Sequence, residues 1–489
     1  MSATVPFAPE PVESGRCHGQ YHVGQDEEDD EVPFAKLIST RRKMPALKPL
    51  SKCIWMVLIA FAVRLSFMLI FSTYTFTGVD DFTQTGEATR IAASIARGNG
   101  FSSPFGDEYT GPTAWIAPVY PYFIALVFHC FGIFSQTSTI IIFTVQGWFS
   151  ALTIIPILGI ADRTVGKRAG LLAGWIWILF PWFGKWAVTW EWEISLSALL
   201  LSLIFWYTLR LEKPATLKSW MTFGALEGFA LLVNPALSAI VPVTLAWHVY
   251  KLRFQRREWL KPAAAMLACL IVMSPWIVRN RIVFGQWVFL RGNFGFEFAL
   301  GNYHNSFGRG WGGFHPGGSL REYADYKQKG EMVYIHSKQK LALQFVRNYP
   351  GEFISLTAKR VAYFWDGSAI GYRPPIARHW VPSSFGALSF LLLPALLVAH
   401  RQGLHAWQAF FGALFVYPMP YYLTFSQSRY RHAIEPLILL LLAYALVEAC
   451  DQAYASMIRA ADHFSSTRTR MKTRVVTHTS KQPAQGSDI

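Results

Sequence analysis

Three carboxylates follow the first long apolar segment of the chain. Asp80 and Asp81 are adjacent, and Glu87 lies about two helical turns further along. Charged groups beside a bilayer are costly, so their presence favours a functional role. A carboxylate in this position can take a proton from an incoming hydroxyl group, and the aspartate pair can also hold a divalent metal ion loosely. These three residues are predicted to be the acidic half of a catalytic site, although Asp81 with Gln84 also fits a helix capping box.

Arginine residues are predicted to supply the complementary positive charge. Arg279 follows the apolar run that ends in PWIV, and Arg429 and Arg431 flank a tyrosine in SRYRH, just before the last apolar run. Arginine binds phosphate in a bidentate manner and stabilises it as a leaving group, whereas arginines at span ends also contact lipid headgroups. We therefore predict that these arginines bind the phosphate of a lipid-linked substrate. Polar and aromatic residues near both groups are predicted to line the substrate pocket: Tyr120, Glu191, Glu193, Asn280 and Tyr430.

The composition is that of a membrane protein with many spans. Of the 489 residues, 52% are hydrophobic and 15% are charged, against about 25% charged residues in soluble proteins. Near-continuous apolar runs at 53–72, 169–183 and 433–449 approach the ~20 residues that a membrane span needs. The net charge of +15 is divided among short clusters between apolar runs. This pattern is typical of cytoplasmic loops and argues against nucleic-acid binding.

One short apolar piece, residues 118–134, decides the topology. If it only dips into the membrane, the cluster Arg163, Lys167 and Arg168 lies inside, and the later short loops also obey the positive-inside rule. We therefore predict an all-α polytopic membrane protein with about ten transmembrane helices. The spans are expected near residues 53–73, 138–160, 169–187, 192–210, 219–233, 236–250, 262–278, 382–399, 406–424 and 432–450.

The remaining segments complete the predicted organisation. Residues 1–50 are expected to be a disordered cytoplasmic tail, and residues 451–489 a disordered basic tail on the same side. Residues 51–450 are expected to form the membrane domain. Its first outer loop, 74–137, carries an amphipathic pattern that predicts an interfacial helix. The long outer segment 279–380 is expected to form a small cap.

Several motifs in a fixed order resemble the membrane-embedded glycosyltransferases of GT-C fold. After the acidic outer loop the chain reads GNGFSSPF, GPTAWIAPVYPYFIALVFHCFG, PWIVRNRIVFGQWVFLRGNFGFEFALGN and SRYRHAIEPL. The sequence is most similar to bacterial proteins with the domain of rhizobial lipopolysaccharide galacturonosyltransferases. The broader relatives include the aminoarabinose transferase of lipid A and the protein mannosyltransferases. The resemblance covers roughly residues 53–450.

The resemblance implies an enzyme of the bacterial inner membrane whose active site faces the periplasm. It implies a polyprenyl-phosphate sugar donor, inversion at the sugar carbon, and a glycan, glycolipid or protein of the cell envelope as acceptor. In such enzymes an acid of the first outer loop is the base or a metal contact. Asp80 and Asp81 fit the position just past the first span, whereas Glu87 fits a glutamate on an interfacial helix, and the aspartates are narrowly favoured. Tyr120, in PVYP, is expected to line the pocket.

Two other functions remain open. A polysaccharide polymerase or ligase with a lipid-diphosphate donor would have its decisive residues in the long outer segment, at Arg309, His315 and Arg321. A transporter or flippase of lipid-linked sugars would line a path with ionisable residues inside the spans. Such residues are few apart from Arg64 and Glu227, and Arg64 is expected to snorkel or to pair within the helix bundle.

Overall fold

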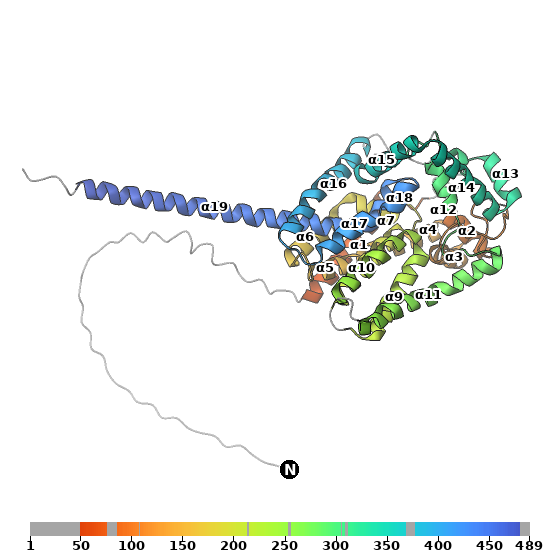
Figure 1. The fold of residues 1–489 in the computed structure, drawn as a ribbon, viewed down its shortest axis with the longest axis horizontal. Helices are drawn as coiled ribbons and strands as arrows, with labels where there is room; N and C mark the ends of the chain where they lie inside the picture. Colours follow the sequence, from red (N-terminus) through yellow and green to blue (C-terminus); the bar gives the residue numbers. More distant parts are fainter. Residues whose placement is uncertain are drawn as a thin grey trace, which may run out of the picture. The chain divides into compact units, whose positions relative to one another are not determined.

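The regular elements of the structure are helices (Figure 1). It is a computed structural model that describes residues 49–75, 86–106, 108–212, 215–252, 256–304, 306–308, 312–367 and 377–479. In these ranges the only β-type contact is an isolated antiparallel bridge between Ser102 and Pro112. The predicted all-α fold is confirmed for this part of the chain. Asp80 and Asp81 lie outside the described residues, as does the predicted tail 1–48.

Four helical stretches are long and apolar enough to cross a membrane. They are residues 51–70 in α1 (Pro49–Ile70), residues 136–161 in α4 (Gln136–Leu152) and α5 (Ile154–Ala161), α11 (Leu260–Phe284), and residues 428–461 in η4 (Ser428–Ile434) and α19 (Glu435–Thr479). A fifth is formed if α6 (Lys167–Leu179) and α7 (Pro181–Val188), which meet at a bend of 55°, are one span. The multi-pass prediction is confirmed.

The predicted number of about ten spans is not confirmed among the described residues. Several of the expected spans are helices that are too short to cross a membrane or that are interrupted by proline. α8 (Ile194–Arg210) and α9 (Leu217–Val233) have 17 residues each, which makes them about 25 Å long. The other helices outside the first outer loop and the cap are η1 (Pro235–Ile240), α10 (Val241–Leu252), η2 (Arg256–Trp259), α16 (Ala377–Arg401), α17 (Trp407–Val416) and α18 (Met419–Leu423).

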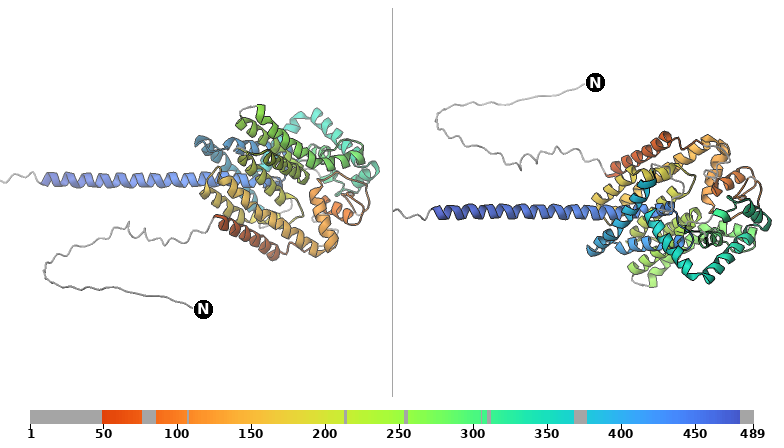
Figure 2. Two further views of the ribbon diagram at one scale, coloured as in Figure 1. Left: turned by 90° about the horizontal axis from the view of Figure 1, so that it is seen from below. Right: turned by 90° about the horizontal axis from the view of Figure 1, so that it is seen from above.

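The first outer loop and the cap lie together at one end of the helix bundle (Figures 1 and 2). The loop contains α2 (Glu87–Ala96), which packs on α3 (Val119–Phe131). α3 has 13 residues, fewer than the ~20 that a membrane span needs. The cap consists of α12 (Phe294–Gly301), η3 (Gly312–Phe314), α13 (Leu320–Lys329), α14 (Glu331–Asn348) and α15 (Pro350–Asp366).

An aromatic core joins the outer loop to the cap. Phe105 and Trp115 of the loop pack edge to face with Tyr326 of α13, and Trp115 also contacts Phe296 of α12. All four side chains are buried. Aromatic pairs of this geometry add stability beyond their buried area. The cap is therefore fixed to the outer loop rather than held only by its covalent links to α11 and α16.

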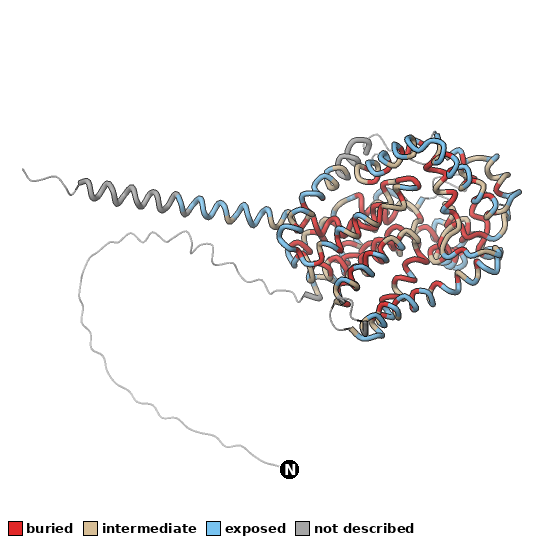
Figure 3. The backbone as a smooth tube through the Cα atoms, viewed as in Figure 1, coloured by how far each residue is buried: buried red, intermediate tan, exposed pale blue. Residues whose placement is uncertain are grey.

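The buried arginine of the first span stabilises the bundle interior. Arg64 of α1 is fully buried and donates hydrogen bonds to the carbonyls of Trp177 and Ile178 at 2.6 and 2.8 Å and to Ser150 Oγ at 3.2 Å. These acceptors belong to α6 and α4, so one guanidinium links three helices. The prediction that Arg64 pairs within the bundle is confirmed. Figure 3 shows the buried residues gathered on the facing sides of the helices.

The last helix continues beyond the bundle. Residues 451–479, predicted to be disordered, are helical as the second part of α19. The sequence of this part contains Ala, Met, Arg and Gln, which are good helix formers, and neither Gly nor Pro. Its side chains are mostly exposed from Cys450 to Ala461 (Figure 3).

Candidate active site

A cavity of about 810 Å³ lies where the outer loop, the cap and the ends of several membrane helices meet. Its walls come from α2, α8, η1, α12 and η4 and from the segment between α11 and α12. Apolar lining residues include Ile116, Ile194, Leu290 and Ala433. The acidic and basic lining residues are Glu87, Glu193, Arg291, Glu297, His315, His336 and Arg429.

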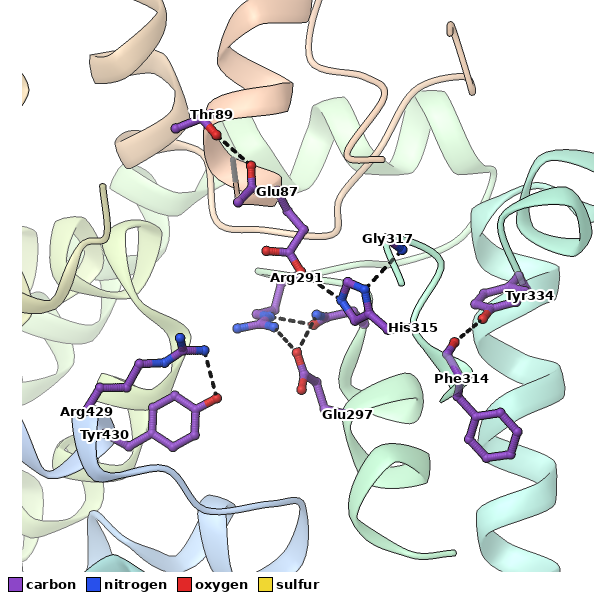
Figure 4. Close-up of polar contacts among 12 residues, drawn as sticks. Glu87, Thr89, Arg291, Glu297, Phe314, His315, Gly317, Tyr334, Arg429 and Tyr430 are labelled. Atoms are coloured by element: carbon purple, nitrogen blue, oxygen red, sulfur yellow. Dashed lines mark hydrogen bonds and ion pairs between the residues drawn. The ribbon is translucent and has the colours of Figure 1, made fainter. Parts of the chain in front are cut away.

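Glu87 and His315 form the central polar contact of the cavity. Glu87 is the first residue of α2, where the positive end of the helix dipole stabilises a carboxylate. Its Oε1 lies 3.0 Å from Nε2 of His315, which comes from the loop after η3 (Figure 4). The Gly317 N–H donates to His315 Nδ1 at 3.1 Å. The neutral ring therefore carries its proton on Nε2 and donates it to Glu87.

The surroundings of Glu87 favour the ionised carboxylate. Burial by itself raises the pKa of Glu87, but the hydrogen bond and charge of His315, with a further contribution from Arg429, lower it to about 2. For His315 burial lowers the pKa, whereas the hydrogen bond and charge of Glu87 and the charge of Glu297 raise it above the ordinary value. At neutral pH the cavity therefore holds a carboxylate at Glu87.

A second acid–base group lies beside this pair. The Arg291 Nη2 is 2.7 Å from Glu297 Oε1, and the Asn293 amide donates to the same oxygen at 2.9 Å. Glu297 is in the first turn of α12, one helical turn after Asn293. Burial raises the pKa of Glu297, and the charge of Arg291 opposes this rise. Figure 4 shows this group directly beside His315.

Arg429 presents a positive charge that is held by aromatic rings. Its guanidinium carbon lies 3.8 Å from the ring centre of Trp192, and Nη2 lies 3.4 Å from the hydroxyl of Tyr430. Trp192 stacks in turn on Trp190, and Tyr430 stacks on Tyr421 with ring centres 4.8 and 4.4 Å apart. Cation–π contacts of this kind orient a guanidinium without neutralising it. Arg429 thus lines the cavity as a cation that is positioned by aromatic rings and that also interacts with the charges of Glu193 and Glu87.

Four of the predicted site residues that the structure describes line this cavity, namely Glu87, Glu193, Arg429 and Tyr430.

The other predicted residues lie outside the cavity lining and make internal contacts. Arg279 donates to two carbonyls of the outer loop at 2.7 and 2.9 Å. Asn280 is fully buried and donates to the Val288 carbonyl at 3.0 Å. Arg431 is also fully buried, with its Nε 3.3 Å from Glu435 Oε1. These three side chains fix backbone segments around the cavity.

Tyr120 and Glu191 are also buried away from the cavity wall. The Tyr120 hydroxyl donates to Gln146 Oε1, and the Gln146 amide donates to the carbonyls of Ala187 and Trp190 at 3.0 and 2.9 Å. Glu191 is buried next to Trp190 in the chain. Tyr120 therefore supports, through Gln146, the segment that leads to Trp192 and Glu193.

Four of the acidic and basic cavity residues were not among those predicted for the glycosyltransferase site: Arg291, Glu297, His315 and His336. The spacing of Asn293 and Glu297 is a sequence signal, because residues four apart share one face of a helix. His315 was expected to matter only in a polymerase or ligase. Of the other residues expected in that case, Arg321 is exposed on α13 and does not line the cavity, and Arg309 lies outside the described residues. In the described ranges, no cluster of three or more His, Cys, Asp or Glu side chains is suited to a metal ion.

Fold and site together define a helical multi-pass membrane protein with a charged cavity beside its outer loop and cap. Residues 115–278 match the family model described as Dolichyl-phosphate-mannose-protein mannosyltransferase. This match confirms the resemblance to membrane glycosyltransferases that the sequence motifs indicated. A comparison with curated protein sequences gave no match.

Solved structures similar to this chain include those of two other proteins. Archaeal oligosaccharyltransferase AglB from Archaeoglobus fulgidus, in complex with an inhibitory peptide and a dolichol-phosphate, has 13% sequence identity and a TM-score of 0.49. That match covers 83% of this chain and 52% of AglB. ArnT from Cupriavidus metallidurans, bound to undecaprenyl phosphate, has 13% identity and a TM-score of 0.39, with 81% of this chain and 78% of ArnT covered. The chain thus spans about half the length of the oligosaccharyltransferase that it matches.

Proposed function

We propose that this protein is a membrane glycosyltransferase that moves a sugar from a polyprenyl-phosphate donor to a hydroxyl of a cell-envelope acceptor. The observation that carries the proposal is one cavity lined by an ionised carboxylate, Glu87, and by a cation held on aromatic rings, Arg429. The match of residues 115–278 to a family named for transfer from dolichyl phosphate mannose supports the same donor class. The multi-pass architecture gives such a lipid access from the bilayer.

In the proposed reaction, Glu87 is the general base. Glu87 Oε1 accepts the hydrogen bond of His315, so Oε2 is the oxygen that would accept the proton of the acceptor hydroxyl. The acceptor oxygen then attacks the anomeric carbon of the sugar, and the bond from that carbon to the phosphate oxygen breaks. Attack from the side opposite to the leaving group inverts the anomeric carbon. The proton ends on Glu87, and polyprenyl phosphate leaves with the bonding electron pair.

Arg429 would stabilise the leaving phosphate. Negative charge grows on the phosphate as the sugar departs, and a guanidinium can accept that charge with two parallel N–H donors. Trp192 and Tyr430 hold the guanidinium in place before the substrate binds, so little reorganisation is needed. The apolar part of the cavity wall suits the first isoprene units of the lipid.

The predicted aspartates keep a role in this proposal. Asp80 and Asp81 precede α2 by a few residues and remain candidates for the base or for a metal contact. Arg279 and Arg431, proposed from the sequence as phosphate ligands, would need to leave their present carbonyl partners to fill that role. We further propose that the site faces away from the cytoplasm, as the charge pattern of the short loops indicates, and, as the family resemblance implies, that it opens to the periplasm from a bacterial inner membrane.

The test is transfer by the purified full-length protein from a panel of polyprenyl-phosphate sugars, scored by release of the lipid phosphate. Glu87→Gln keeps the shape of the side chain and is expected to lower kcat by about 10²–10⁴-fold, as loss of a general base does. Glu352→Gln, in the cap and outside the cavity lining, is the matched control and is expected to behave as wild type. Full activity of Glu87→Gln together with loss of activity in Asp81→Asn would assign the role of general base to Asp81 instead of Glu87.

A second candidate function is supported by one observation. His315 comes from the long outer segment and lines the cavity, as expected for a polymerase or ligase that uses a lipid-diphosphate donor. The same panel distinguishes the two functions when it includes polyprenyl-diphosphate sugars. Transfer from diphosphate donors alone would replace the proposal by this second function.

A further inference from the structure

The segment 286–294 connects α11 to α12 and forms one wall of the cavity. We call residues 286–294 the interfacial strap. α11 ends at Phe284, and Gly285 adopts the left-handed conformation with φ of 69°, which turns the chain out of the helix axis. The strap therefore begins directly after a helix that is long and apolar enough to span the membrane.

Three hydrogen bonds hold the backbone of the strap against the protein. Asn280 Nδ2 donates to the Val288 carbonyl at 3.0 Å, and Trp276 Nε1 donates to the Leu290 carbonyl at 2.5 Å. The Gly292 N–H donates to the Ala114 carbonyl of the outer loop at 2.8 Å. The bonded residues alternate along the strap, and Val288 is buried. The strap is thus a fixed wall rather than a loose loop.

The strap carries three large aromatic side chains that are exposed. Trp287, Phe289 and Phe294 are 64%, 61% and 54% exposed, and the rings of Trp287 and Phe289 lie nearly parallel with centres 6.5 Å apart. Arg281, one turn before the end of α11, lies with its guanidinium carbon 5.7 Å from the Trp287 ring. The strap continues the exposed apolar side of α11, where Ile282 is 78% exposed.

Because the aromatic side chains of the strap continue the exposed apolar side of α11, the same surroundings are expected to cover both. The exposed apolar side of a membrane span faces lipid, and the residues that follow the span lie at the depth of the headgroups. Tryptophan and other aromatic residues are enriched at this depth, with cationic side chains beside them that reach lipid phosphates. A water-exposed cap surface would not gather three large aromatic side chains and an arginine on one short segment.

We propose that the interfacial strap inserts Trp287, Phe289 and Phe294 into the interfacial layer of the bilayer and is the wall past which lipid-linked substrate moves between bilayer and cavity. The first part is independent of the enzymatic activity. The second part rests on the proposed function, because it requires a substrate with a lipid tail. The same residues line the cavity inside and meet lipid outside, so a tail crossing here stays in apolar surroundings.

Photocrosslinking tests contact between the strap and lipid. A photoactivatable benzoylphenylalanine is placed at position 287 or 289 of the full-length protein in vesicles of phosphatidylethanolamine and phosphatidylglycerol with radiolabelled acyl chains. The matched control carries it at position 320, on cap helix α13, where Leu320 is 88% exposed. We expect about tenfold more labelled lipid on positions 287 and 289 than on 320, as for side chains that lie among lipids. Equal labelling at all three positions overturns the proposal.

Kinetics test the passage of substrate. The double variant Trp287→Ser, Phe289→Ser is expected to raise KM about tenfold for a long-chain polyprenyl-phosphate donor relative to a short-chain, water-soluble donor. Tyr109→Ser removes an exposed aromatic side chain of the outer loop away from the cavity and should change neither value. Equal changes of KM for the long-chain and the short-chain donor would refute the proposal that lipid-linked substrate moves past the strap. Absence of transfer by wild-type protein from every donor would instead refute the proposed function, and the crosslinking result would still decide on the strap.

Discussion

Replacing His315 tests how the cavity keeps Glu87 ionised. In the wild-type protein the hydrogen bond from His315 Nε2 and the charge of the ring oppose the effect of burial on Glu87. His315→Ala removes both contributions, whereas His315→Gln removes the charge and keeps an amide donor. Because burial then acts with less opposition, the pKa of Glu87 rises in both variants, and more in the alanine variant.

The size of the effect follows from the wild-type pKa. Glu87 has a pKa of about 2 against an ordinary value of 4.5, and this difference corresponds to about 3 kcal/mol in favour of the carboxylate. The hydrogen bond and charge of His315 are the largest contributions that lower this pKa, so their loss should return it toward the ordinary value. At the ordinary value of 4.5 about half of Glu87 is ionised near pH 4.5, and nearly all of it near pH 7.5.

The assay is the pH dependence of kcat/KM for transfer, expressed as the ratio of variant to wild type at each pH. A base with a lowered pKa stays active down to low pH, and activity is lost as pH falls through the raised pKa of the variant. For His315→Ala the ratio should fall about twofold between about pH 7.5 and pH 4.5, and less for His315→Gln. A ratio that is constant over this range would refute the view that His315 sets the ionisation of Glu87.

Three further predictions concern charge and packing. Arg429→Ala should lower kcat/KM for the donor about 10²-fold and Arg429→Lys less, because lysine keeps the charge but not the bidentate fork; equal losses in steady-state kinetics would contradict this. Arg64→Leu leaves buried carbonyls without donors and should cost about 3 kcal/mol, seen as a lower thermal unfolding midpoint. Gly224→Ala would place a Cβ 1.8 Å from the Ala265 carbonyl oxygen and should also lower the midpoint, whereas Gly184→Ala, with open space around its Cα, should not.

The helical fold could be predicted from sequence because apolar runs are a local property. Their division into spans depends on where helices break, which hydropathy does not show. The run at 406–424, predicted as one span, is divided into α17 and α18 by Tyr417 and Pro418. Pro418 cannot donate the backbone hydrogen bond that a continuous helix requires.

Only some of the cavity residues could be predicted from the sequence, because the direction in which a side chain points depends on the local helix type and on packing. Arg429 and Arg431 look equivalent in the sequence SRYRH. In the structure this segment is the 3₁₀ helix η4, whose three residues per turn direct residues two apart to different sides. Arg429 therefore lines the cavity, while Arg431 is buried against Glu435. No local pattern distinguishes the two, since the difference lies in what packs around the helix.

The contact between Glu87 and His315 changes how the competing functions can be told apart. The hypothesis of a glycosyltransferase with a monophosphate donor required an acid from the first outer loop. The hypothesis of a polymerase or ligase required residues from the long outer segment. The structure brings one residue of each kind into a single pair, so the origin of the site residues no longer discriminates. Among the described cavity residues Arg291 forms an ion pair with Glu297, whereas Arg429 lies over the Trp192 ring and interacts with Glu87 and Glu193 through charge alone. Under the proposed function Arg429 binds a single phosphate group, and a donor panel that contains both monophosphate and diphosphate sugars decides between the two functions.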